Sequence, residues 1–176
     1  FNNALNRVPQ KTPPIWFMRQ AGRYHSHYQN LKEDYSFEEL CKNPELAAQT
    51  ALGPINDFDF DVSILFSDIL FPLEALGMDL KYNPGPIFGK FINNANYDEL
   101  KTAEEALIDL TFQSEALKIT REILPKNKSL IGFVGGPWTV ASYGTGMNKG
   151  VNHKGNFKND FIFKLLTKKI IPLLKR

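Results

Sequence analysis

The stretch PPIWFMRQAGRY, residues 13–24, places an apolar run directly before a short polar turn. The apolar run PIWFM, residues 14–18, predicts a buried β-strand. Arg19 and Arg23 follow it in a turn around Gly22. Two guanidinium groups at the end of one strand indicate a site for an anion, because arginine binds carboxylates through two parallel hydrogen bonds. The alternative is that both arginines form surface ion pairs with some of the 19 acidic residues.

Two further apolar runs, VSILF (62–66) and LIGFV (130–134), are also predicted strands, and helical stretches separate the runs. Short, uniformly apolar strands that alternate with helices are typical of a buried parallel sheet, so we expect an α/β fold. Ligands of such folds bind beyond the carboxyl ends of the strands. Asp68 follows the second run, and Tyr143 lies one helical stretch after the third. The sequence thus predicts that the arginines, Asp68 and Tyr143 share one site.

The intervening segments carry helix and turn signals. Leucines and alanines at helical spacing predict a continuous helix over 103–124. Residues 80–97, rich in Pro, Gly and Asn, predict a loop or hairpin, and residues 148–158 predict a linker. The other predicted helices are two stretches within 36–58, the second beginning near Pro44, a short helix closed by Gly77, one beginning near Pro137, and an amphipathic one over 161–176.

Several candidate residues also have structural explanations. Asp68 could be the N-cap of the helix that follows it, and Tyr143 could be a core residue. His25 and His27 could form a metal pair, but no third ligand lies nearby in the sequence, so a solvated loop is the preferred interpretation. Cys41 lies among apolar helix neighbours and is expected to be an inert, buried thiol.

The composition limits the classes of protein. A chain of 176 residues, 43% hydrophobic and 23% charged, can form one domain with a real core. A net charge of +2 argues against nucleic acid as the partner. One cysteine excludes an intrachain disulfide and favours a reducing cytoplasm, and no apolar run is long enough to predict a membrane span. The chain starts with Phe and its last predicted helix has no cap, so we expect it to be part of a longer protein.

Four motifs, PPIWFMRQAGRY, ILFSDIL, LEALGMDL and GFVGGPWTVASY, resemble the uroporphyrinogen decarboxylase family in the same order, from near residue 5 to about residue 145. The resemblance implies a (β/α)8 TIM barrel roughly twice as long as this chain. Residues 1–176 would then be a partial single domain, the N-terminal half of the barrel, without its C-terminal half and inactive alone. The resemblance also implies a homodimer that uses no metal and no organic cofactor. From the composition we expect a cytoplasmic protein that binds neither nucleic acid nor membrane.

The resemblance further implies an activity and roles for the candidate residues. The family is a carboxy-lyase of haem biosynthesis that removes the four acetate carboxyl groups of uroporphyrinogen III to give coproporphyrinogen III. Asp68 would face the pyrrole N–H groups and stabilise a protonated pyrrole, while Ile64, Phe66 and Leu70 would form an apolar wall. The implied catalytic residues are Asp68 and Tyr143, and the implied substrate-binding residues are Arg19, Gln20, Ala21, Gly22, Arg23, Asp68 and Tyr143, with Gln20 to Gly22 acting as backbone donors.

The chain departs from the family pattern at several positions. His25-Ser26-His27 stands where the family usually has Leu-Pro-Glu, Lys32 replaces a common arginine, and Gly144 replaces a common methionine. Residues after 145 match poorly. Two alternatives stay open: a barrel-related cobalamin-linked methyltransferase, which would use a zinc thiolate site and lack the RQAGRY stretch, and a porphyrin-binding remnant without turnover.

Overall fold

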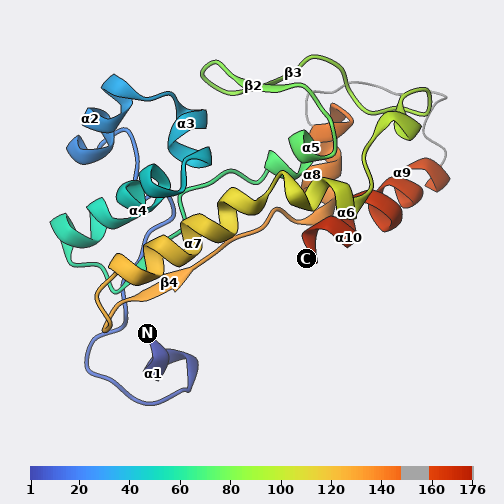
Figure 1. Cartoon of the computed structure of the whole chain (residues 1–176). Coiled ribbons are helices and arrows are strands. Elements are labelled where there is room, and N and C mark those ends of the chain that lie inside the picture. Colours follow the sequence, from blue (N-terminus) through green and yellow to red (C-terminus); the bar gives the residue numbers. More distant parts are fainter. Residues whose placement is uncertain (148–158, 176) are drawn as a thin grey trace. The chain divides into compact units, whose positions relative to one another are not determined.

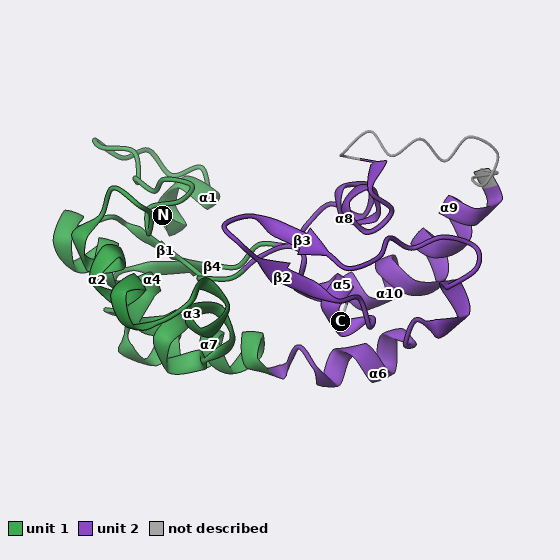
Figure 2. Cartoon of the chain, turned by 90° about the horizontal axis from the view of Figure 1, so that it is seen from above, with its two compact units in different colours: residues 1–67, 112–133 green, residues 68–111, 134–176 purple. Residues whose placement is uncertain are grey.

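The computed structural model describes residues 1–147 and 159–175 (Figure 1). Helices and strands both occur along the chain, which confirms the predicted α/β class. The chain divides into two compact units, which are coloured separately in Figure 2 and are described one at a time below. Unit 1 comprises residues 1–67 and 112–133, and unit 2 comprises residues 68–111 and 134–176.

A parallel pair of short strands, β1 (Val62–Ile64) and β4 (Ser129–Ile131), lies in unit 1. In their register Val62 pairs with Ser129. Both strands overlap apolar runs that the sequence predicted to be strands, and they pair in the predicted parallel sense. Parallel neighbours require a crossover connection, and helix α7 directly precedes β4 in the chain.

The strand predicted over residues 14–18 is wrong, because these residues are irregular. Ile15 still joins the start of β1: its N–H donates to Asp61 Oδ2 at 2.7 Å, and Asp61 N donates to Ile15 O at 3.0 Å. Pro13 and Pro14 have no N–H group with which to extend this pairing. The apolar run therefore indicated a segment beside β1 but not a strand.

One helix of unit 1 packs on β1, and two others pack on that helix. Helix α4 (Pro44–Phe58) contacts the strand, and α2 (Ser26–Asp34) and α3 (Phe37–Lys42) contact α4. A capping box between Ser36 and Glu39 begins α3. The adjoining α3 and α4, with proline at the first position of α4, confirm the two predicted helices. The remaining helices of this part are α1 (Asn2–Leu5) and α7 (Thr111–Ile123).

Unit 2 holds the larger hydrophobic core, which includes Leu73, Leu76 and Val140. The predicted hairpin is confirmed, since β2 (Leu80–Tyr82) and β3 (Pro86–Phe88) pair antiparallel. The other elements of this unit are α5 (Phe71–Ala75), which Gly77 follows with a φ of +106°, η1 (Tyr97–Glu99), α6 (Ala103–Ile108), α8 (Pro137–Gly144), α9 (Asn159–Leu165), the π-helical turn η3 (Leu166–Ile170) and α10 (Ile171–Leu174).

The continuous helix predicted over 103–124 is wrong, because α6 ends at Ile108 and α7 begins at Thr111. Between them, the Asp109 carboxylate pairs with Lys101 Nζ at 2.5 Å. The two helices also serve different cores, since α6 packs in unit 2 whereas Ala116 of α7 is buried in unit 1. One apolar stripe in the sequence therefore corresponds to two separate packing faces.

The C-terminal helical prediction is confirmed by α9, η3 and α10. The linker predicted over 148–158 lies outside the described residues. Within residues 1–147 and 159–175, no helix is both long and apolar enough to cross a membrane.

Candidate functional site

Arg19 and Arg23 are exposed residues of a turn in unit 1, residues 17–25, here called the arginine turn. Arg19 has a φ of +64°, a left-handed conformation that is uncommon for a residue with a side chain. Neither guanidinium forms an ion pair or a hydrogen bond with any residue that the structure describes. The surface ion-pair alternative thus finds no acidic partner in this part of the chain, and both charged groups are available to a ligand.

The buried side chain of Gln20, 1% exposed, anchors the arginine turn to β1. Its Nε2 donates to Val62 O at 2.9 Å, and its Oε1 accepts from Phe17 N at 3.2 Å. Tyr24 Oη donates to the carbonyl oxygen of Gln20 at 2.5 Å, which closes the turn. The sequence predicted only that the backbone of Gln20 acts. In the structure its side chain also attaches the turn to β1.

Three backbone N–H groups of the turn were predicted to face the ligand. Gln20 N already donates to Phe17 O at 3.2 Å. The N–H groups of Ala21 and Gly22 donate to no acceptor among the described residues. A Cβ atom at Gly22 would lie 3.0 Å from Arg19 O, so glycine permits the tight approach. The turn therefore combines two guanidinium groups with two N–H groups that have no partner in the described chain.

His25 is buried and His27 lies in helix α2, so the predicted solvated loop is wrong for both residues. His25 is 3% exposed, and its Nε2 lies 2.6 Å from Asp57 Oδ2. His27 Nε2 lies 3.1 Å from the carbonyl oxygen of Gln49. Each imidazole thus has a protein partner, and across the described ranges no three potential metal ligands come together.

Tyr28 connects the arginine turn electrostatically to the interior of unit 1. Burial raises the pKa of the Tyr28 hydroxyl, the Cys41 thiol raises that pKa further, and the Arg23 guanidinium lowers it. Cys41 is 1% exposed, which confirms the predicted buried thiol. The positive charge of Arg23 therefore acts on a side chain of the interior although Arg23 itself is exposed.

Asp68 is the first residue of unit 2. Its Oδ1 accepts a hydrogen bond from Leu70 N at 2.8 Å, which fixes the turn before α5. The N-cap of α5 is Leu70, so Asp68 supports the turn two residues earlier and is not itself the N-cap. Its second carboxylate oxygen has no hydrogen-bond partner in the described part of the chain. Asp68 thus combines a local structural bond with one oxygen that can accept from a ligand.

The predicted apolar wall needs one correction. Leu70 is 2% exposed in the core of unit 2, so its side chain cannot also face a ligand. Ile64 and Phe66 are half-buried in unit 1, and the Phe66 ring lies 5.6 Å from that of Tyr28 and 5.9 Å from that of Phe37. Two of the three predicted wall residues therefore retain accessible apolar surface.

Tyr143 lies on α8, half-buried against the core of unit 2. Its hydroxyl makes no hydrogen bond to a described residue. The end of α8 is held by a neighbouring loop, because Ile92 N donates to Gly144 O at 2.8 Å. A Cβ atom at Gly146, whose φ is +75°, would lie 2.8 Å from the Phe91 ring. The helix that carries Tyr143 is therefore fixed at its C-terminal end.

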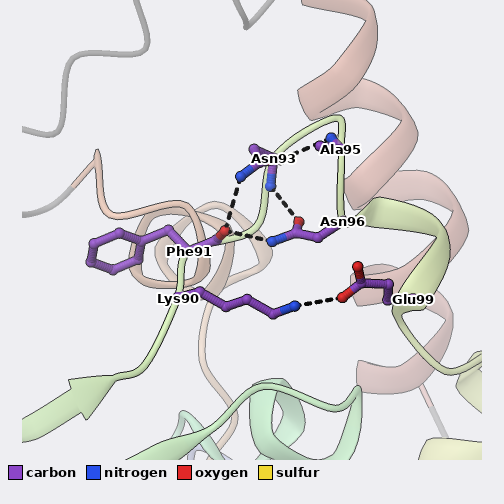
Figure 3. Close-up of polar contacts among 6 residues, drawn as sticks. All are labelled: Lys90, Phe91, Asn93, Ala95, Asn96 and Glu99. Atoms are coloured by element: carbon purple, nitrogen blue, oxygen red, sulfur yellow. Dashed lines mark hydrogen bonds and ion pairs between the residues drawn. The ribbon is translucent and has the colours of Figure 1, made fainter.

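Side-chain hydrogen bonds brace the loop that contacts α8 (Figure 3). Asn96 Nδ2 donates to Phe91 O at 2.9 Å, and Asn96 Oδ1 accepts from Asn93 N at 2.8 Å. Lys90 Nζ lies 2.5 Å from Glu99 Oε2 at the base of the same loop. These bonds brace the backbone at Phe91, and the next residue, Ile92, donates to Gly144 O at the end of the helix that carries Tyr143.

The predicted site residues fall in both units. The arginine turn belongs to unit 1, whereas Asp68 and Tyr143 belong to unit 2. Within unit 2, a Cβ atom at Gly135 would lie 3.1 Å from Ile69 Cβ, so the segment after Asp68 contacts the segment before α8. That all these residues share one site stays a prediction.

Sequence reasoning missed the residues that support the site. These are the Gln20 side chain, the His25–Asp57 pair, and Gln113, whose Nε2 donates to Ser67 Oγ at 2.9 Å beside Asp68. The only local signal is a polar residue within or beside an apolar pattern. The partners lie 42, 32 and 46 residues away in the chain, so only the fold identifies them.

Comparison with known proteins gives a consistent result. The family description "Uroporphyrinogen decarboxylase (URO-D)" matches residues 1–162. A protein of Orientia tsutsugamushi named uroporphyrinogen decarboxylase is 43% identical over 98% of this chain and 53% of its own length. A protein of the same name from Neorickettsia sennetsu is 46% identical over 73% of this chain and 39% of its own length. A methyltransferase from Methanosarcina mazei has a similar fold, with a TM-score of 0.72, 19% sequence identity, and coverage of 97% of this chain and 51% of that one.

The fold likeness and the secondary structure define an α/β protein. The family match over residues 1–162 and the identities of 43% and 46% go further: the chain belongs to the uroporphyrinogen decarboxylase family. The chain spans about half the length of the curated relatives it matches, since it covers 53% of one and 39% of another.

Proposed function

We propose that this chain is the N-terminal half of a uroporphyrinogen decarboxylase that converts uroporphyrinogen III into coproporphyrinogen III by removing four acetate carboxyl groups. The complete protein would be a (β/α)8 barrel and a cytoplasmic homodimer that uses neither a metal nor an organic cofactor. The arginine turn, Asp68 and Tyr143 would act together on one substrate molecule.

The observation that carries this proposal is the arginine turn. Two guanidinium groups without a partner among the described residues flank two similarly unpaired N–H groups, those of Ala21 and Gly22. Charged donors and backbone donors of this kind bind carboxylates most strongly when they are already in position. Uroporphyrinogen has eight carboxylates, so a preformed cationic turn suits it.

Asp68 supplies the negative charge that the chemistry requires. Protonation of a pyrrole carbon creates a cationic ring, and cleavage of the bond to the carboxylate then sends its electron pair into that ring as carbon dioxide leaves. The resulting methylene group takes up a proton to become methyl, and the ring loses the proton it had gained. A fixed carboxylate beside the ring stabilises the cation, and the second oxygen of Asp68 is available to accept pyrrole N–H groups.

Tyr143 would orient Asp68 or a substrate carboxylate through its hydroxyl. This role is consistent with a half-buried tyrosine whose hydroxyl has no partner among the described residues. The braced loop before η1 would limit the movement of that hydroxyl.

The test is anaerobic decarboxylation of uroporphyrinogen III by the complete protein and by its Asp68→Asn variant. Asparagine retains the acceptor for Leu70 N but removes the charge, so we expect kcat to fall by roughly 10²-fold or more with an unchanged unfolding midpoint. No turnover by the wild type would refute the function. Near-normal kcat in the variant would refute the role of Asp68.

A further inference from the structure

We propose that the His25–Asp57 pair is a positioning device for Arg23. The buried imidazole would fix the backbone at the exit of the arginine turn, so that the Arg23 guanidinium meets a ligand carboxylate in one orientation. The inference rests on the proposed function for the identity of the ligand, a polycarboxylate. His25 and Asp57 touch no substrate in this account and act only through Arg23.

The His25–Asp57 pair anchors the exit of the arginine turn firmly. His25 is 3% exposed, and its Nε2 lies 2.6 Å from Asp57 Oδ2. An ionised carboxylate can only accept a hydrogen bond, so the hydrogen must lie on Nε2. The Nε2–H group then donates a short, charge-assisted hydrogen bond to Asp57. Asp57 lies in the last turn of α4, and the Phe58 ring lies 5.1 Å from the imidazole. The imidazole is therefore held by both a polar and an aromatic neighbour from one helix.

Hydrogen bonds connect this anchor to the backbone of Arg23. His25 N donates to Gly22 O at 2.9 Å, which spans the backbone of Arg23. The Gln29 side chain donates to the Arg23 carbonyl oxygen, and Gln29 N donates to His25 O at 3.0 Å. The backbone of Arg23 is thus fixed on both sides although its guanidinium has no partner among the described residues.

The two ends of the arginine turn have different anchors. Gln20 directly follows Arg19 and ties that end of the turn to Val62 O of β1. His25 lies two residues after Arg23 and ties the other end to α4. Each arginine therefore has its own buried support, and a defect in one support should affect mainly the nearer arginine.

The experiment is a pair of double-mutant cycles in the complete protein, with decarboxylation kinetics as the readout. His25→Leu should raise KM by about tenfold and leave kcat within about twofold, because a positioning residue couples to the group it positions. The same substitution should have little further effect in an Arg23→Ala background and its full effect in an Arg19→Ala background. His25→Gln retains an N–H donor at similar reach, so its KM should stay close to that of the wild type.

Two further variants test whether a rise in KM could come from general destabilisation of the protein. Asp57→Ala removes the acceptor from a side chain that is 48% exposed, so the protein should fold, and KM should rise as in His25→Leu. Lys128→Met breaks another carboxylate pair of unit 1, the 2.5 Å contact with Asp59, and within the described residues Lys128 makes no hydrogen bond to the arginine turn. We expect that control to leave KM unchanged even if its melting temperature falls.

The outcomes separate this inference from the proposed function. Equal effects of His25→Leu in the two arginine backgrounds, or a change confined to kcat, would overturn the inference while the function stands. If the wild type does not decarboxylate uroporphyrinogen, the proposed function is refuted. The ¹⁵N relaxation of the Arg23 Nε–H group then still tests whether His25 positions Arg23. That group should become more mobile in His25→Leu and not in Lys128→Met, and unchanged relaxation would refute the role of His25.

Discussion

Replacing Gln20 by methionine removes the amide that anchors the arginine turn and keeps the length of the side chain. Two hydrogen bonds disappear, the one to Val62 O at 2.9 Å and the one from Phe17 N at 3.2 Å. Val62 is 0% exposed, so its carbonyl oxygen cannot turn to water for a replacement donor. The cost therefore comes mainly from one buried acceptor that is left unsatisfied.

The magnitude follows from the two bonds. A buried acceptor without a partner costs about 1–3 kcal/mol, and the lost, partly buried bond to Phe17 adds about 0.5–1.5 kcal/mol. Better burial of an apolar side chain offsets part of this sum. We expect the free energy of unfolding to fall by about 2 kcal/mol, close to the centre of the range for the unsatisfied group. Gln20→Glu should cost more at neutral pH, because its ionised carboxylate would face Val62 O, and less at acidic pH, because a protonated carboxyl can donate.

Urea unfolding followed by tryptophan fluorescence measures this effect, and Trp16 lies in the run that leads into the arginine turn. Gln113→Met is the matched control, since that residue makes one half-buried bond of 2.9 Å to Ser67 and should cost about 1 kcal/mol or less. A Gln20→Met protein as stable as the wild type, with unchanged KM, would show that the amide does not hold the turn.

Three other predictions concern separate parts of the chain. Arg23→Lys keeps the charge but loses the planar fork, so substrate binding should weaken by about 1.5–3 kcal/mol, and an unchanged kcat/KM would contradict the proposed two-hydrogen-bond contact between Arg23 and a substrate carboxylate. Gly146→Ala places a Cβ atom 2.8 Å from a ring at a φ of +75° and should lower stability by about 1–2 kcal/mol, whereas Gly85→Ala, which meets nothing within 4 Å, should be near neutral in the same thermal melts. Backbone and side-chain hydrogen bonds from Thr102 hold the pKa of Glu105 below its ordinary 4.5, so this capping box stabilises α6 above that pH and its contribution is lost as the pH falls through the lowered pKa. An NMR titration checks this, because Thr102→Ala should return the midpoint toward 4.5.

The parts of the fold that sequence predicted well are those in which local chemistry and packing agree. Strands β1 and β4 each contain two apolar residues, one serine and no proline, and the side chains of Ser36 and Asn43 cap the N-termini of α3 and α4. The run over 14–18 has the same apolar character, but Pro13 and Pro14 remove the donors that a strand needs. The stripe over 103–124 is continuous in sequence, yet its halves pack in different cores, and periodicity cannot distinguish one core from two.

The candidate site also has residues that the sequence could predict and residues that it could not. The charged and polar residues that would bind a ligand could be predicted from the sequence, because their residue types suit an anionic ligand and because they follow apolar runs. Their supports could not be predicted, because Gln20 and His25 look like ordinary polar residues of a loop until the fold brings Val62 O and Asp57 within bonding distance. Burial of a polar side chain depends on a distant partner, and one sequence contains no local sign of it.

The backbone of Arg19 links the supports to the function. A residue with a Cβ atom in the left-handed region costs roughly 1–2 kcal/mol, and glycine at this position would avoid that cost. The guanidinium gains nothing from the described chain in return, since it has no partner there. Strain of this kind persists only where the surroundings fix the conformation, and here the next residue, Gln20, is tied to β1 through a buried amide. The turn therefore holds an arginine in an unfavourable conformation and leaves its charge without a partner in the described chain. That arrangement is costly for folding alone but is suited to meeting a carboxylate from outside the chain.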